Sequence, residues 1–190
     1  MKEDPSRKNG KFVGKRNIPF REEEEAKLLE MAKVLSTVFH GTEDKFSIEF
    51  RKEVENDKFN VSSHTVLITI PLKPLHKKVH HPGGSTYFID DNAKVVLNFA
   101  HRLGDNGKGQ QEVQSRCFVL FHNIWEREYR HKNKYPYSIN PHFDYGYYVD
   151  VIWEDMIVPC MQQLSDDFGL YALGMDTAKL NEYKPEHHGS

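Results

Sequence analysis

The chain has 190 residues, with 26 Lys and Arg against 28 Asp and Glu, and a formal net charge of -2 at pH 7. The length fits one domain with a single core, and the balanced charge excludes a strongly basic nucleic-acid binder held by net charge. Aromatic residues make up 12% of the chain, which excludes an acidic disordered protein. Only two cysteines, Cys117 and Cys160, are present, so no disulfide scaffold is expected.

The sequence favours a soluble protein of the cytoplasm without a membrane anchor. No apolar run approaches the roughly 18 residues that a membrane helix needs, and residues 1–15 are charged, with no apolar signal segment. The composition along the chain predicts three parts. These are a flexible basic arm over 1–17, a single domain over 18–174 and a loose polar tail over 175–190.

The first predicted element is an amphipathic helix that begins near Phe20. Four consecutive glutamates over 22–25 fall in its first turn, where the helix dipole favours carboxylates. Gly41 is a natural stop at its C-terminal end. The apolar residues that recur at helical spacing are Leu28, Leu29, Met31, Ala32, Leu35, Val38 and Phe39.

The apolar period then changes from 3.6 residues to 2. Phe46, Ile48 and Phe50 alternate with polar residues, as in a half-buried strand. Residues 59–70 form the best candidate for a central strand, and Pro71 ends it. The two segments predict a β-hairpin.

A basic, histidine-rich segment over 73–84 follows, and the sequence predicts a loop. His76, His80 and His81 have a spacing compatible with zinc or nickel binding, the nearby lysines suit phosphate contacts, and a plain exposed connection is the third interpretation. Strand-forming residues at 86–89 and 94–99, separated by turn residues, predict a second hairpin. A helix over 93–103 is the alternative.

Two further helices are predicted, over 110–131 and 147–164. In the first, apolar residues recur at spacings of three and four, and arginines line the opposite edge. In the second, Pro159 should kink or shorten the helix. The apolar stripe of the first helix consists of Val113, Cys117, Leu120, Phe121 and Ile124. The residues expected to face inward in the second are Val149, Ile152, Trp153, Met156, Ile157 and Cys160.

The predicted elements together indicate an α+β fold. An N-terminal helix would be followed by a four-stranded antiparallel sheet built from two hairpins, with two C-terminal helices packed on one face. Strands grouped in the middle and helices segregated to the ends are typical of this class.

One candidate metal site lies near the predicted C-terminal helices. Glu128 and His131 have the Glu-x-x-His spacing that places both side chains on one helix face, and His142 and Asp144 follow in a loop. These four residues could form a mixed nitrogen and oxygen site for zinc, manganese or iron. In the alternative, the helix ends by residue 128 and both Glu128 and His131 lie in solvent.

A second catalytic hypothesis concerns RNA. Arg116 and His122 have an Arg-x5-His spacing within the predicted helix, which resembles that of small helical RNases of the HEPN group. The glycine-rich segment 104–109 precedes the expected N-terminus of the same helix, a place where backbone N–H groups can hold an anion. The resemblance implies RNase activity, and this joins the metal site in one alternative function, a metal-dependent hydrolase or RNase.

The densest aromatic segment lies between residues 135 and 148. Tyrosine combines contact area with a polar group and is favoured at interfaces. We therefore expect a non-catalytic binding or regulatory module that contacts a protein partner or a second copy of itself, with nucleic acid as a further possibility. In the alternative interpretation this segment packs its own aromatic side chains over the sheet. The candidate partner-binding residues are Tyr135, Tyr137, Phe143, Tyr145, Tyr147, Arg127 and Arg130.

Overall fold

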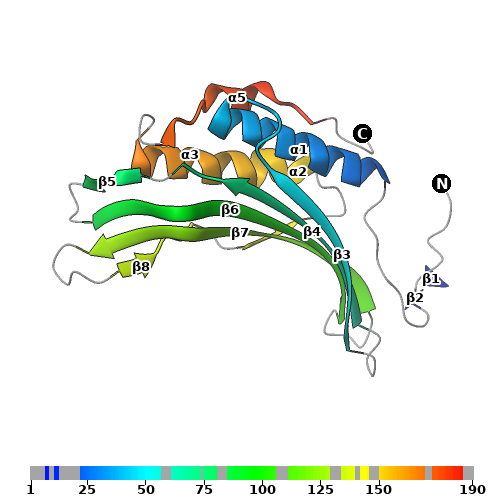
Figure 1. Cartoon of the computed structure of the whole chain (residues 1–190). Coiled ribbons are helices and arrows are strands. Elements are labelled where there is room, and N and C mark those ends of the chain that lie inside the picture. The colour runs from blue at the N-terminus through cyan, green and yellow to red at the C-terminus, as the bar shows by residue number, and fades with distance from the viewer. Residues whose placement is uncertain are drawn as a thin grey trace.

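The structure is a computed structural model that describes residues 7–8, 11–12, 22–56, 61–73, 75–80, 85–105, 111–128, 134–139, 142–145, 150–169 and 173–185. Along parts of the strands, including 52–56, 61–64, 102–105 and 111–114, it describes the backbone only. Helices lie on one face of a curved antiparallel sheet (Figure 1). Two short segments, β1 (Arg7–Lys8) and β2 (Lys11–Phe12), pair with each other apart from this sheet.

Helix α1 (Glu22–His40) confirms the first predicted element. Its apolar residues are buried except Leu29, which is 37% exposed, and the chain leaves the helix at Gly41, whose φ of +73° suits glycine. The Ser36 hydroxyl donates a hydrogen bond to the carbonyl oxygen of Thr42 (2.6 Å) and accepts one from the amide of Lys45 (2.8 Å). These bonds fix the connection from α1 to the first strand of the sheet.

The sheet is built on two long central strands, β6 (Ser85–Asp105) and β7 (Gln111–Glu128), which pair along almost their whole length. On the β6 side of this pair, two strands follow each other along β6. They are β4 (Val61–Pro71) and β5 (Leu75–His80). The other edge carries β8 (Lys134–Pro136) and β9 (His142–Tyr145). Strand β3 (Ser47–Asn56) pairs with β4, which confirms the first predicted hairpin.

The predicted second hairpin is wrong, because residues 86–99 belong to one strand. Residues 90–92, expected to form a turn, instead belong with Ala93 to a bulge of β6 that lies opposite the single residue Asn123 of β7. Asn92 and Asn123 both have positive φ, near +60°, which asparagine tolerates better than most residues. The segment predicted as a loop also contains a strand, β5, which the pairing with β6 holds in place.

The predicted helix over 110–131 is also wrong, since this segment is strand β7. Its apolar residues fit helical spacing, but Cys117, Val119 and Phe121 equally fit the alternation of a strand with one buried face. Segments rich in β-branched and aromatic residues favour sheets, and pairing with β6 decides between the two periods. A basic helix edge therefore does not exist.

Two functional expectations depended on that helix. Arg116 and His122 lie six residues apart in one strand, which separates their Cα atoms by about 20 Å rather than the roughly 9 Å of a helix. The glycine-rich segment begins inside β6, at Gly104 and Asp105, and the next element described is strand β7 rather than a helix. Neither the RNase spacing nor the helix N-terminal anion site is therefore present.

The C-terminal helical segment confirms the helix predicted over 147–164, and it continues to Phe168. A short helix α2 (Asp150–Ile152) runs into a π-helical turn η1 (Trp153–Ile157) and then into α3 (Val158–Phe168), with Pro159 in the first turn of α3. The expected inward residues from Ile152 to Cys160 are buried, whereas Val149 lies outside the described residues.

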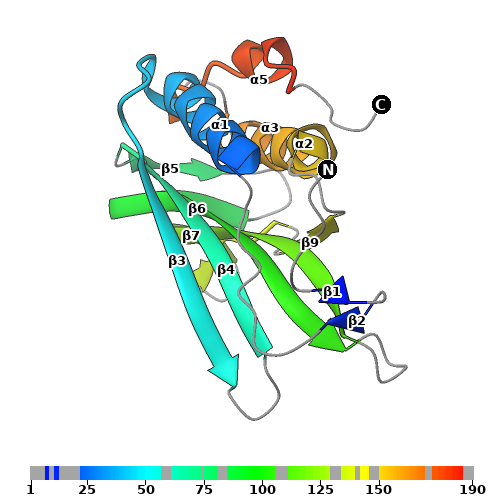
Figure 2. The same cartoon turned by 90° about the vertical axis from the view of Figure 1, so that its right-hand side faces the viewer.

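Residues 173–185 do not behave as the expected loose tail. Helix α5 (Ala178–Glu182) lies on the side of α1 away from the sheet, as Figures 1 and 2 show. Leu180 is fully buried, and the amide of Asp176 donates to the carbonyl oxygen of Val38 at 2.9 Å. These contacts make the segment part of the core.

The α+β class and the placement of helices on one face are confirmed. The sheet is larger than expected, with a continuous path of five strands, β3-β4-β6-β7-β8, and seven strands once β5 and β9 are included. Among the helices in the described part of the chain, none combines the length and apolarity required to cross a bilayer.

Candidate functional site

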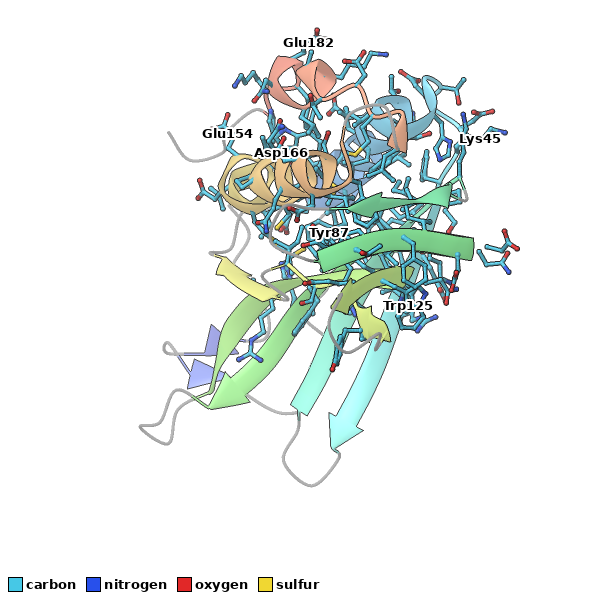
Figure 3. All side chains as sticks on the ribbon, turned by 90° about the vertical axis from the view of Figure 1, so that its left-hand side faces the viewer. Lys45, Tyr87, Trp125, Glu154, Asp166 and Glu182 are labelled. Carbon is cyan, nitrogen blue, oxygen red and sulfur yellow. The ribbon has the colours of Figure 1, made fainter. Side chains whose placement is uncertain are left out.

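Tyr137, one of the predicted partner-binding residues, belongs to the core. It is only 4% exposed, and its ring makes edge contacts with Tyr87, Phe121 and Phe168 at centroid distances of 5.1 to 5.5 Å. Figure 3 shows Tyr87 in the layer between the sheet and α3. The alternative interpretation, in which this segment packs its own aromatic residues over the sheet, therefore holds at Tyr137.

A hydrogen bond explains why a tyrosine occupies this position. The Tyr137 hydroxyl donates to the Asp167 carboxylate on α3 at 2.5 Å. Burial, and then the neighbouring carboxylate, raises the pKa of Tyr137 well above its usual range. The hydroxyl is consequently held protonated and joins α3 to the segment after β8.

The other residues of the predicted partner surface are scattered. Tyr135 in β8 is 44% exposed and remains accessible. In the strand register, Arg127 of β7 lies opposite Lys134 of β8. Phe143 and Tyr145 lie in β9, near the other end of β7. Tyr147 and Arg130 lie outside the described residues. The described positions therefore do not form one continuous surface.

The four residues of the predicted metal site are also not brought together. Glu128 lies at the end of β7 opposite Ser85, whereas His142 and Asp144 pair with Phe118 and Arg116. Ten residues of extended strand between positions 118 and 128 correspond to roughly 30 Å, and His131 lies outside the described residues. The backbone thus separates Glu128 from both His142 and Asp144 by far more than a metal coordination sphere.

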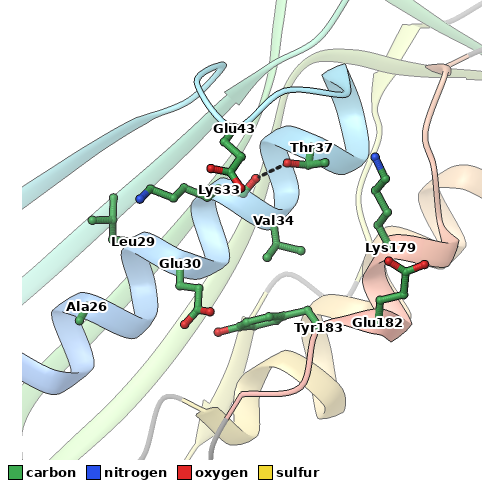
Figure 4. A pocket seen from close by; sticks show the side chains of 10 residues that line it. All are labelled: Ala26, Leu29, Glu30, Lys33, Val34, Thr37, Glu43, Lys179, Glu182 and Tyr183. Atoms are coloured by element: carbon green, nitrogen blue, oxygen red, sulfur yellow. Dashed lines mark hydrogen bonds between the residues drawn. The ribbon is translucent and has the colours of Figure 1, made fainter.

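A groove of about 650 Å³ lies between the outer side of α1 and the segment containing α5 (Figure 4). The α1 residues that line it extend from Ala26 to Thr37, a distance of about 16 Å along the helix axis. Leu29, which is 37% exposed, and Val34 supply apolar surface. The complete lining consists of Ala26, Leu29, Glu30, Lys33, Val34, Thr37, Glu43, Lys179, Glu182 and Tyr183.

The wall of the groove opposite α1 is anchored to the core. The Tyr183 ring packs edge-on against Trp153 at a centroid distance of 4.8 Å, and the Trp153 indole N–H donates to the carbonyl oxygen of Leu180 at 3.2 Å. In Figure 4 the Tyr183 hydroxyl points across the groove toward Glu30. Because Trp153 is fully buried, the groove is preformed rather than assembled from loose side chains.

The groove combines apolar surface with charged side chains. Its described lining contains no histidine, cysteine or serine, and its charged groups are three carboxylates and two ammonium groups. Apolar surface with a few polar groups at the margin is typical of recognition sites. The arrangement fits an apolar side chain flanked by charges.

A second feature of the structure is a polar row in the middle of the sheet. Directly paired positions cross the strands in rows, and one row consists of apolar residues, of which Val66, Phe99 and Cys117 are fully buried. This apolar row consists of Phe50, Val66, Phe99, Cys117 and Phe143. The row two residues further along each strand, the polar row, consists of Lys52, His64, His101, Ser115 and Tyr145.

Glu24 of α1 meets this polar row. It occupies the core-facing stripe of the helix one turn before Leu28, and it is 1% exposed. Its Oε2 atom lies 3.6 Å from Nε2 of His101, which is fully buried, and Ser115 beside it is buried as well. Three elements thus place a carboxylate, an imidazole and a hydroxyl group at the end of the hydrophobic core.

Within the side chains that the structure describes, no cluster of three or more His, Cys, Asp or Glu residues gathers as a metal site. Both cysteine thiols are free and buried, and burial raises the pKa of Cys117 and of Cys160. Protonated, inaccessible thiols are poor nucleophiles. This fits the expectation that Cys117 is a core residue.

Sequence reasoning missed both the groove and the polar row. The members of the polar row are separated by up to 93 positions along the chain, from Lys52 to Tyr145, and only the strand register aligns them. One available signal was Glu24, a carboxylate at a core position of an amphipathic helix, since a buried charge requires a partner. Comparison with protein-family models, with curated proteins and with solved structures found no match.

Proposed function

We propose that the protein is a non-catalytic binding module that holds an amphipathic helical segment of a protein partner in the groove between α1 and α5. The observation that supports this proposal is the groove itself, which combines exposed apolar surface at Leu29 with a charged margin. Helices bind such grooves through apolar anchors spaced three, four or seven residues apart. The 16 Å length of the α1 wall corresponds to about three helical turns, enough for anchors seven residues apart.

The charge of the groove favours protein over nucleic acid. Glu30, Glu43 and Glu182 outnumber Lys33 and Lys179, so a phosphate backbone would meet net repulsion. A partner segment with basic residues beside its apolar anchors complements this margin. Self-association through the groove would require the same surface on a second copy and is one outcome of the test below.

The exposed side chain of Tyr135 remains a proposed contact residue, as the sequence suggested. It lies on β8 at an edge of the sheet, and tyrosine provides contact area at low entropic cost. Tyr137 is excluded from this role because its ring and hydroxyl are used inside the core.

We further propose a cytoplasmic setting. The two buried cysteines are close enough for Cys160 to influence the pKa of Cys117, yet neither forms a disulfide. Thiols that remain reduced fit a reducing compartment.

Selection from a displayed library of random helical peptides tests the proposed function. We expect enriched peptides to carry apolar residues at helical spacing and to bind the full chain with Kd values that fluorescence anisotropy can measure. Leu29→Gln should raise Kd about tenfold, because one apolar anchor contact contributes on the order of 1.4 kcal/mol. Leu120→Gln is the matched control, since Leu120 has a similar exposure of 40% but lies on the sheet.

Three results would overturn the proposal. The library could yield no binder, the Leu29→Gln variant could bind as well as the natural chain, or the Leu120→Gln variant could lose binding instead. Circular dichroism of both variants shows that a loss of binding is not a loss of folding. Light scattering on the unliganded chain detects dimers, and dimers dispersed by Leu29→Gln would reassign the groove to self-association.

A further inference from the structure

Strand β3 lies at an edge of the sheet. In the part of the chain that the structure describes, β3 pairs with β4 alone, and Figure 2 shows it at the margin of the sheet. Along an edge strand, every second residue directs its backbone N–H and C=O groups away from the neighbouring strand. The outer side of β3 therefore offers a row of backbone donors and acceptors with which another strand can pair.

An aromatic ring is exposed at this edge, between two residues of opposite charge. Phe50, the member of the apolar row that lies on β3, is 44% exposed, although Val66 opposite it on β4 is fully buried. Glu49 and Arg51 precede and follow it on the other face of the strand, and their side chains are 56% and 47% exposed. The Arg51 guanidinium donates two hydrogen bonds to the Glu49 carboxylate, at 2.8 and 2.9 Å.

One register of β3 against a second copy of itself matches these side chains. In antiparallel pairing, residues whose backbone groups point outward face each other, so the two-fold axis of a symmetric pair passes through a residue position. With the axis at Phe50, the two Phe50 residues are opposite each other, and Glu49 of each copy is opposite Arg51 of the other. An axis moved by one residue places either Glu49 against Glu49 or Arg51 against Arg51. Like charges directly opposite are destabilising, which disfavours both shifted registers.

We propose that the chain forms a symmetric dimer in which β3 pairs antiparallel with β3 of a second copy, centred on Phe50. The pairing makes one continuous sheet and joins the two apolar rows at the Phe50 rings. The four charges around the axis alternate in sign, so each Glu49 carboxylate has an arginine in its own strand and another in the facing strand. This inference is independent of the proposed groove, which shares no residue with β3.

The charges on β3 also explain why the partner is a second copy rather than any exposed strand. Charged side chains along an edge oppose indiscriminate strand pairing. Pairing is then favourable only where each charge meets its opposite, and the reversed sequence of β3 supplies that pattern. One strand from each copy buries less than the roughly 1,600 Å² of a standard interface. We therefore expect a reversible dimer with a Kd in the micromolar range.

Exchange of charges across the axis tests the register. Sedimentation velocity of the full chain over a concentration series should show an equilibrium between monomer and dimer. Glu49→Arg and Arg51→Glu should each weaken self-association at least about tenfold, because symmetry repeats each like-charge contact. The double variant Glu49→Arg/Arg51→Glu should restore it. An equimolar mixture of the two single variants should also dimerise, since two arginines on one edge then face two glutamates on the other.

Three further variants separate this edge from other surfaces. Phe50→Gln should weaken the dimer about tenfold, because the aromatic contact at the axis is lost. Glu22→Arg changes the net charge as Glu49→Arg does, but at an exposed position of α1, and should dimerise as the natural chain does. Leu29→Gln in the groove should also leave the dimer intact, which distinguishes this contact from self-association through the groove.

Any of three results would overturn the proposal. The natural chain could remain monomeric at the highest concentration measured. The mixture of single variants could stay as dissociated as its components, although circular dichroism shows both to be folded. Finally, Leu29→Gln could disperse a dimer that Phe50→Gln leaves intact, which would assign self-association to the groove instead.

Discussion

The apolar row and the polar row are neighbours on the same strands, and they have the same register but opposite chemistry. Phe99 and His101 are both completely buried, two residues apart on β6. Phe99 contributes to stability through packing alone, whereas His101 requires a specific partner in Glu24. Burial by itself therefore does not identify a residue as part of the structural core. The need for a matched polar partner distinguishes a candidate site from packing.

The largest effect is expected in the apolar row. Phe99→Ala should lower the free energy of unfolding by about 4 kcal/mol, because it removes a large buried side chain and leaves a cavity. Urea denaturation followed by fluorescence measures this loss. Phe118→Ala on the same sheet, where the side chain is only half-buried, should cost clearly less. Equal losses would mean that both faces of the sheet support the core equally.

The next largest effect is expected in the polar row, where a double-mutant cycle measures the coupling between Glu24 and His101. Glu24→Met and His101→Leu should each lower the free energy of unfolding by about 3 kcal/mol, because each leaves the other polar group buried. The double variant should lie within about 1 kcal/mol of the natural chain, since apolar replacement of a buried pair is close to neutral. Urea denaturation of the two single variants and of the double variant measures the three losses. Additive losses would show that the two side chains are not coupled.

This contrast also explains what the sequence could and could not predict. The α1 stripe, strand β4 and the helical segment that contains Pro159 follow from local periodicity. Strand β7 could not be distinguished from a helix, because its apolar residues satisfy both periods and the pairing partner lies elsewhere in the chain.

The candidate sites were harder to predict than the elements. The polar row depends on register across five strands, and the groove depends on how α5 packs against α1. Local spacing is informative only for residues within one element, which is why Glu128 and His142 appeared close in sequence although the fold separates them. A carboxylate at a core position, as at Glu24, was the one local clue to the polar row.

A smaller effect is expected at Tyr137, where a polar atom is matched inside the aromatic cluster. Tyr137→Phe should lower the free energy of unfolding by about 2 kcal/mol, because the hydrogen bond to the Asp167 carboxylate is lost. The variant Tyr135→Phe, at an exposed position, should change stability by less than about 0.5 kcal/mol.

The pH dependence at Tyr137 gives a second readout with a definite sign. Because its pKa is raised in the folded state, the unfolded chain loses this proton first as the pH rises above about 10. Tyr137 therefore contributes stability below pH 10 that declines at higher pH, by up to about 1.4 kcal/mol per pH unit. Urea denaturation between pH 8 and 11 should give a shallower decline for Tyr137→Phe than for the natural chain. Identical slopes would contradict the burial of this hydroxyl.

The smallest effect is expected at the bulge opposite Asn123. At this bulge the buried positions of β7 change from odd to even residue numbers. Phe121 and Val119 share the core-facing side, and after Asn123 the next buried residue is Ile124, so one residue shifts the pattern. Asn123→Gly should leave stability within about 0.5 kcal/mol, because glycine adopts positive φ readily. Asn123→Ala should cost about 1 kcal/mol, since a Cβ is strained in the left-handed region. If Ala and Gly were equally tolerated in thermal denaturation, the bulge would not impose this backbone conformation. The change in which residues of β7 are buried would then arise from packing of Ile124 alone.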